Sequence, residues 1–269
     1  MILRVFERLL NIDDIDCRWT VRVMFILCVF SRLAVFFNPY TDTDFTWINS
    51  WMSTADTTGD LAAQAAQSFP ITTGNIVFLA TASFTLFFTL MMGILYSALY
   101  VRSFKRKKLE KEKDTAWEKD EPAKTGKIMK RFLLLTLFYL AVSVPFVIIN
   151  SNLVIFFCLG FPYVFTAPAC YLSGDKGMFS AIPYVVKITK GFYLAHLRSL
   201  FLIMLVFFFT DAVAGLTSYV SLTSFYILSA FFSTWITFAV GRYAGMAYCA
   251  MRDAHGYTVI KPEKESKIE

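Results

Sequence analysis

The sequence predicts an all-α, polytopic membrane protein with six transmembrane helices and both termini in the cytoplasm. Three observations lead to this prediction. Hydrophobic residues make up 57% of the 269 residues, charged residues only 17%, and the mean hydropathy is +0.54. Soluble domains have about a quarter charged residues. Several apolar segments reach the roughly 20 residues that a helix needs to cross a bilayer, and the basic residues gather on one side of the resulting arrangement. This composition excludes a soluble enzyme fold, a secreted disulfide scaffold and a disordered chain.

The apolar segments are separated by polar or charged stretches and form a single domain, 1–269. The predicted spans are residues 20–38, 75–100, 132–149, 153–171, 194–211 and 222–247. We expect the first span to be retained and not cleaved as a signal peptide. Asp13, Asp14 and Asp16 precede it, and no small-x-small cleavage site follows Phe37.

The distribution of lysine and arginine sets the orientation. With the N-terminus inside, the outer regions are 39–74, 150–152 and 212–221, and none of them contains a lysine or arginine. A five- or seven-helix arrangement would put lysines 176, 187 and 190, or those of the C-terminal tail, on the wrong side. The sequence therefore predicts a multi-pass membrane protein with both termini in the cytoplasm.

Two segments outside the spans have the composition of surface helices. Residues 1–16 alternate apolar and charged positions at helical spacing, which predicts either an amphipathic helix on the inner leaflet or an extension of the first span. The extracytoplasmic loop, 39–74, contains Trp47 and Trp51, and tryptophan favours the membrane–water boundary. We expect a helix at 44–68 on the outer surface, with a lid over a ligand as the alternative.

The cytoplasmic loop 101–131 carries the net charge of the chain. Residues 102–131 hold twelve basic and six acidic residues, an excess of six that equals the whole net charge of +6. The run Lys105, Arg106, Lys107 and Lys108 is a candidate contact for anionic lipid, at about 1 kcal/mol per charge. It is also typical of a positive-inside signal on a solvated helix. Nucleic acid is not an expected partner, because no aromatic residue interleaves the run.

Prolines interrupt two predicted spans: Pro145 the third, Pro162 and Pro168 the fourth. Each kinks a helix by removing a backbone donor. Kinks of this kind occur in ordinary packing and also at the midplane sites of transporters.

A short cytoplasmic helix is predicted between the fourth and fifth spans, within 173–190. Gly174 and Gly177 indicate turns, and Asp175 is a candidate helix cap. We expect Lys187 and Lys190 on the polar face, where they are candidates for docking a partner. The apolar face is expected to contain Met178, Ile182, Val185 and Val186.

The last span ends with Gly241 and Gly245 in a G-x-x-x-G pattern. Small residues at this spacing let two helix backbones approach closely. The sequence leaves open whether that contact forms within the bundle or between protomers.

Ionisable residues inside spans are the candidate functional residues. Arg32 is the clearest, and we expect it either to pair with Asp211, with Asp42 and Asp44 as competitors, or to extend towards the outer surface. His196 and Arg198, near the inner end of the fifth span, are interfacial residues or candidates for a catalytic or gating role.

No sequence pattern assembles a catalytic, cofactor-binding or metal site. The five cysteines are scattered, none in C-x-x-C spacing, and the two histidines are far apart. A P-loop and a G-x-S-x-G turn are both missing from the sequence. We therefore expect no catalytic residues, no cofactor and no metal.

The stretch 168–256 contains three short motifs, two before the last two predicted spans and one after them. They read Pro168-Ala-Cys-Tyr, then Asp175-Lys-Gly with a helix ending Lys190-Gly191-Phe192, then Tyr248-Cys-Ala-Met-Arg252-Asp-Ala-His-Gly256. This stretch resembles the membrane domain attached to some bacterial glycerophosphoryl diester phosphodiesterases, and related stand-alone six-helix membrane proteins of unknown function. The resemblance implies a bacterial plasma (inner) membrane protein. It does not imply phosphodiesterase activity, which belongs to a separate soluble barrel.

The predicted function is that of a non-enzymatic membrane subunit or accessory protein, acting with a partner in transport or cell-envelope assembly. The alternative is a small stand-alone transporter or a carrier that binds lipid or an anion; an intramembrane enzyme is a third reading. Expected partners are membrane lipids and either a protein partner or further copies of the chain.

Overall fold

The computed structural model describes residues 11–46, 71–111, 124–149 and 166–254, and within these ranges the chain is helical with no β-strand. Four helices of the described part are long and apolar enough to cross a membrane. They are α2 (Arg18–Phe36), α5 (Thr73–Lys111), α9 (Tyr193–Thr217) and α10 (Leu222–Ala254). The prediction of an all-α chain is thus confirmed for these ranges, and these four helices are compatible with a membrane-embedded protein. Six spans and the sidedness of the termini stay predictions.

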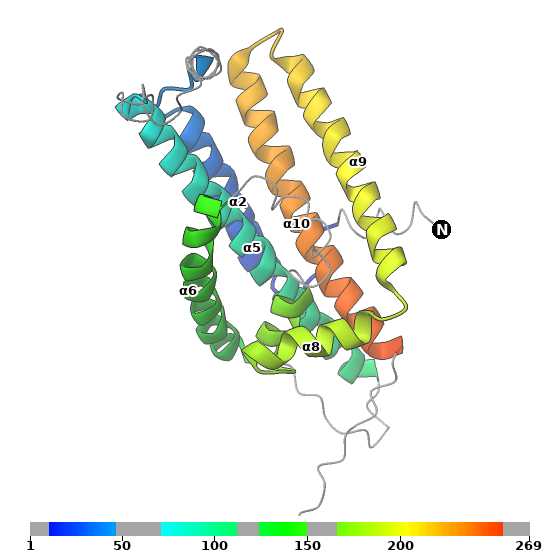
Figure 1. The fold of residues 1–269 in the computed structure, drawn as a ribbon. Helices are drawn as coiled ribbons and strands as arrows, with labels where there is room; N and C mark the ends of the chain where they lie inside the picture. The colour runs from blue at the N-terminus through cyan, green and yellow to red at the C-terminus, as the bar shows by residue number, and fades with distance from the viewer. Residues whose placement is uncertain (1–10, 47–70, 112–123, 150–165, 255–269) are drawn as a thin grey trace, which may run out of the picture.

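The bundle is built around α10, which contacts α2, α5 and α9, while α2 also contacts α5. The long helices lie side by side (Figure 1). α6 (Thr125–Ile149) runs next to α5, and α8 (Met178–Thr189) crosses one end of the bundle. At that end, here called the α8 end, α2 and α6 begin and α5 and α10 finish.

Several helices extend beyond the predicted spans. α5 continues to Lys111 and α10 to Ala254, so residues 101–111 are helix and not loop, and α6 already begins at Thr125. Hydropathy indicates where a bilayer ends, but lysine, arginine and glutamate are good helix formers and let a helix continue into water. Pro145 lies inside α6, which runs on to Ile149. Of the predicted fourth span, 153–171, only residues 166–171 are described, and the predicted 44–68 surface helix lies largely outside the described ranges.

The closest helix contact joins α5 and α10 through glycines. A Cβ atom on Gly241 would overlap the carbonyl oxygen of Gly93 in α5, and one on Gly245 would lie 2.9 Å from the carbonyl oxygen of Ser97. Only hydrogen at these positions allows the two backbones to meet. The G-x-x-x-G pattern therefore packs within the bundle, which resolves the alternative that the sequence left open.

The segment before α2 is a turn that packs beneath the bundle. Tyr96 of α5 donates a hydrogen bond to the carbonyl oxygen of Ile12 at 2.9 Å, and Ile15 is buried. The Asp14 carboxylate lies 3.0 Å from Lys107 Nζ and 3.5 Å from Arg242 Nη2. Residues 11–17 therefore form neither the amphipathic helix nor the span extension that we expected, because side chains of α5 and α10 bind their backbone and carboxylates. The rest of that prediction, residues 1–10, lies outside the described ranges.

Candidate functional site

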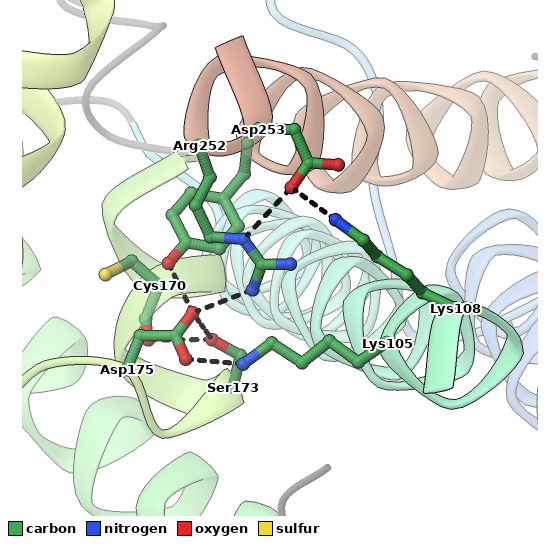
Figure 2. Close-up of polar contacts among 8 residues, drawn as sticks. Lys105, Lys108, Cys170, Ser173, Asp175, Arg252 and Asp253 are labelled. Atoms are coloured by element: carbon green, nitrogen blue, oxygen red, sulfur yellow. Dashed lines mark hydrogen bonds and ion pairs between the residues drawn. The ribbon is translucent and has the colours of Figure 1, made fainter. Parts of the chain in front are cut away.

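A buried cluster of polar side chains fastens the turn before α8 to α5 and α10 (Figure 2). Asp175, in that turn, accepts a hydrogen bond on Oδ1 from Lys105 Nζ of α5 at 2.5 Å. On Oδ2 it accepts one from Tyr248 of α10 and one from Ser173 at 3.0 Å, and Arg252 Nη1 of α10 lies 3.7 Å away. The side chains of Lys105, Asp175 and Arg252 are 3%, 5% and 3% exposed. We call these five residues the Asp175 cluster.

A helix-ending turn places Asp175 in the cluster. The helix at 166–173 closes with the N–H of Gly174 bound to the carbonyl oxygen of Tyr171 and the N–H of Asp175 bound to that of Cys170. This is the Schellman arrangement, and Gly174 has the positive φ of 95° that it requires. We expected Asp175 to cap α8, and this prediction was wrong. Gly177 is the N-cap residue of α8 and has no side chain with which to cap it. The Asp175 carboxylate is instead bound by side chains of α5 and α10.

The charges of the Asp175 cluster hold the turn before α8 against α5 and α10. Burial alone would raise the pKa of the Asp175 carboxyl, but Lys105, Tyr248 and Arg252 outweigh it and hold that pKa below its usual value. Asp175 is thus a carboxylate at neutral pH, between two buried cations. Removing one partner of a buried ion pair costs about 3–5 kcal/mol, because the other charge stays desolvated. The cluster fixes the position of α8 relative to the bundle.

In this position α8 has three distinct faces. Ala181, Val185 and Ile188 are buried against the bundle, at i, i+4 and i+7 spacing. Ile182 and Val186, which we expected on the same face, are 55% and 46% exposed. They form a second apolar face with Phe179, which is 79% exposed. The prediction that Ile182 and Val186 face the bundle was wrong. The 3.6-residue period of a helix allows either apolar face to be the buried one, and the contacts of α8 with the bundle decide which it is.

The third face of α8 is polar and basic. Lys187 is exposed in its last turn, and Lys190, directly after the helix, is also exposed. The structure thus presents both predicted docking residues at the surface. Gly191, with φ of 91°, then reverses the chain into α9.

The basic run at 105–108 is paired with acidic side chains of the same chain. The pairs are Lys105–Asp175, Arg106–Glu110, Lys107–Asp14 and Lys108–Asp253, with N–O distances of 2.5, 3.1, 3.0 and 3.4 Å. Figure 2 shows the Lys108–Asp253 pair beside the Asp175 cluster. These carboxylates balance the charge that we expected to attract anionic lipid, so contact between lipid and this run stays a prediction.

Arg32 does not meet the carboxylates expected for it. It lies one turn after Cys28 on the half of α2 that packs on the bundle, and within the described ranges its buried Nε has no hydrogen-bond partner. Asp211 is exposed on α9, and α10 lies between α2 and α9 (Figure 1). The carboxylates of Asp42 and Asp44 accept from Thr72 and Thr46 instead. The predicted Arg32–acid pair is therefore not formed among the described residues.

His196 joins α9 to α10. Its Nδ1 lies 2.6 Å from the Tyr243 hydroxyl and its Nε2 lies 3.1 Å from Met251 Sδ, and the imidazole is buried. Arg198, two residues further on, is exposed. The structure does not bring the two candidates together, and His196 makes a packing contact.

Within the described ranges no three His, Cys, Asp or Glu side chains come together as a metal site requires. Comparisons with protein-family models, with curated proteins and with solved structures found no match for this chain. The resemblance noted from the sequence therefore stays a prediction. Its motifs nevertheless contain Asp175, Tyr248 and Arg252, which the fold brings together in the Asp175 cluster. Sequence reasoning quoted these residues but did not assign them to a common site. The signal that points to them is an aspartate between two turn glycines and an arginine one helical turn after a tyrosine.

Proposed function

We propose that this protein is a non-enzymatic integral membrane subunit or accessory protein, which acts with a partner protein in transport or cell-envelope assembly. The observation that carries the proposal is the fixed position of α8 across the end of the bundle. A helix held by the buried Asp175 cluster offers a preformed surface, so a partner would not have to order it on binding.

The basic face of α8 indicates the chemistry of the partner. Lys187 and Lys190 are exposed on α8 and directly after it, and both would lie on the cytoplasmic side in the predicted orientation. A complementary surface is acidic, and exposed charges of this kind govern the rate and specificity of association more than its strength. The polar groups of the Asp175 cluster bind one another, which supports a structural role for them over a chemical one.

Native mass spectrometry after gentle extraction from the source membrane tests the proposal. We expect the chain with a protein partner in fixed stoichiometry, and loss of that partner from a Lys187→Glu, Lys190→Glu double variant. A matched double variant, Lys124→Glu, Lys130→Glu, reverses the same amount of charge at exposed positions around the start of α6 and should keep the partner. A wild-type chain that is recovered alone, with a tightly retained lipid or small anion, would contradict the proposal and favour the carrier alternative.

A further inference from the structure

An apolar groove of about 230 Å³ lies between α6, the 166–173 helix and α8. Its walls are aliphatic and aromatic, and the only polar atoms that their side chains contribute are the hydroxyls of Tyr139 and Tyr171. Leu135 and Phe138 of α6 form one wall, and Ala167 the next. The third wall belongs to the exposed apolar face of α8, where Phe179 and Ile182 line the groove. A concave apolar site of this kind suits a hydrocarbon chain.

The groove begins at the polar end of α6. Arg131 lies one turn before Leu135, on the same side of the helix. Its Nη1 donates to the carbonyl oxygen of Tyr171 at 2.7 Å, and its guanidinium carbon lies 5.4 Å from the centre of the Tyr171 ring. Because Tyr171 also lines the groove, these two contacts hold the guanidinium at the groove's end.

The charge at this end is basic. α6 contains Lys127, Lys130 and Arg131 and no acidic residue, and within the described ranges none of the three is in an ion pair with a carboxylate. This differs from the run at 105–108, where every basic residue faces an acid. At helical spacing Lys127 and Arg131 share the groove side of α6, whereas Lys130 faces away from it.

The geometry points to a binding site for an anionic phospholipid, with one acyl chain in the groove and the phosphate at Arg131 and Lys127. In a membrane-embedded chain the polar end of α6 lies at the level of lipid headgroups, and its apolar part lies at the level of acyl chains. Guanidinium groups bind phosphate through charge-assisted hydrogen bonds. The site is separate from the basic face of α8, so neither proposal depends on the other.

Native mass spectrometry of the purified full-length chain, in detergent with added lipid, tests the headgroup part. Phosphatidylglycerol and phosphatidylcholine with identical acyl chains serve as probes. We expect one phosphatidylglycerol to be retained, and its occupancy to exceed that of phosphatidylcholine by roughly tenfold, the effect of one charge-assisted contact. Arg131→Gln should remove this preference and Arg131→Lys should restore most of it. Lys130→Gln, the matched control, should not change it.

Filling the groove tests the acyl-chain part. Ala167→Phe should abolish retention of both lipids, whereas Ala141→Phe, at an exposed position on the far side of α6, should not. Thermal unfolding of each variant shows whether it is folded. Equal retention of lipid by Ala167→Phe and the wild type would overturn the site. Displacement of the lipid by inorganic phosphate would do the same, because it would identify a phosphate site without an acyl-chain contact.

Discussion

Asp175 is the residue on which the α8 end of the bundle depends. Its carboxylate lies between the buried cations Lys105 and Arg252, and it also accepts hydrogen bonds from Tyr248 and Ser173. Two of these four partners are nearly fully desolvated cations, so the contribution of Asp175 lies less in any one bond than in the charge that it neutralises.

Removing the negative charge of Asp175 should destabilise the folded chain. We expect Asp175→Asn to lower the free energy of unfolding by about 3–5 kcal/mol, because it removes the negative charge that the buried side chains of Lys105 and Arg252 both face. Asp253→Asn, at a residue whose side chain is 34% exposed, should cost far less. Thermal unfolding in detergent measures both, and equal losses would contradict the central position of Asp175.

The stabilisation that the Asp175 carboxylate provides should depend on pH in a defined direction. The pKa of Asp175 is lower in the folded chain than its usual value near 4. The stabilisation from Asp175 is therefore complete above about pH 4 and is lost only as pH falls through the lower, folded-state pKa. The stability gap between wild type and Asp175→Asn should stay constant from about pH 8 to pH 5 and narrow in stronger acid. A gap that narrows near neutral pH would show that the pKa is raised instead.

Among the elements, α5 and α10 are joined most closely, and the glycines of α10 are the reason. The sequence predicted small-residue packing at Gly241 and Gly245, and the structure assigns their contact to Gly93 and Ser97 of α5. The length of α5 was predicted less well. Its charged last turns look like a loop in a hydropathy profile, yet they stay helical and place Lys105 in the Asp175 cluster.

A single methyl group tests the α5–α10 contact. Gly241→Ala should destabilise the bundle by about 1–3 kcal/mol, the usual cost of overpacking, because its Cβ overlaps the carbonyl oxygen of Gly93. Gly215→Ala, in α9, adds the same methyl group where nothing lies within 4 Å. That control should be neutral or slightly stabilising through helix propensity. Equal melting temperatures for the two variants would rule out the close contact.

For the whole molecule, the arrangement in Figure 1 separates the α8 end from the 218–221 connection at the other end. The sequence predicts that the first faces the cytoplasm and the second the outside, since basic residues mark the inner side. Tyr219 is 89% exposed in that connection, and Lys187 is exposed on α8.

Cysteine labelling tests this orientation. In a chain whose native cysteines are replaced, Tyr219→Cys should react with a membrane-impermeant thiol reagent in intact cells. Lys187→Cys should react only after the cells are permeabilised, and the cysteine-free parent is the control. Labelling of both positions from outside would contradict the predicted topology.

The sequence by itself determined the helical, apolar class of this chain, the approximate positions of four helices long and apolar enough to cross a membrane, and the presence of a short helix before α9. These follow from local patterns, because bilayer thickness sets the length of an apolar helix and glycine marks a turn. The tertiary structure decided which side chains meet. Asp175 lies 70 residues from Lys105 and 73 from Tyr248, and their contact depends on how each helix is rotated and packed. Arg32 and Asp211 show the converse, because charge alone suggested a pair that the position of α10 between α2 and α9 prevents.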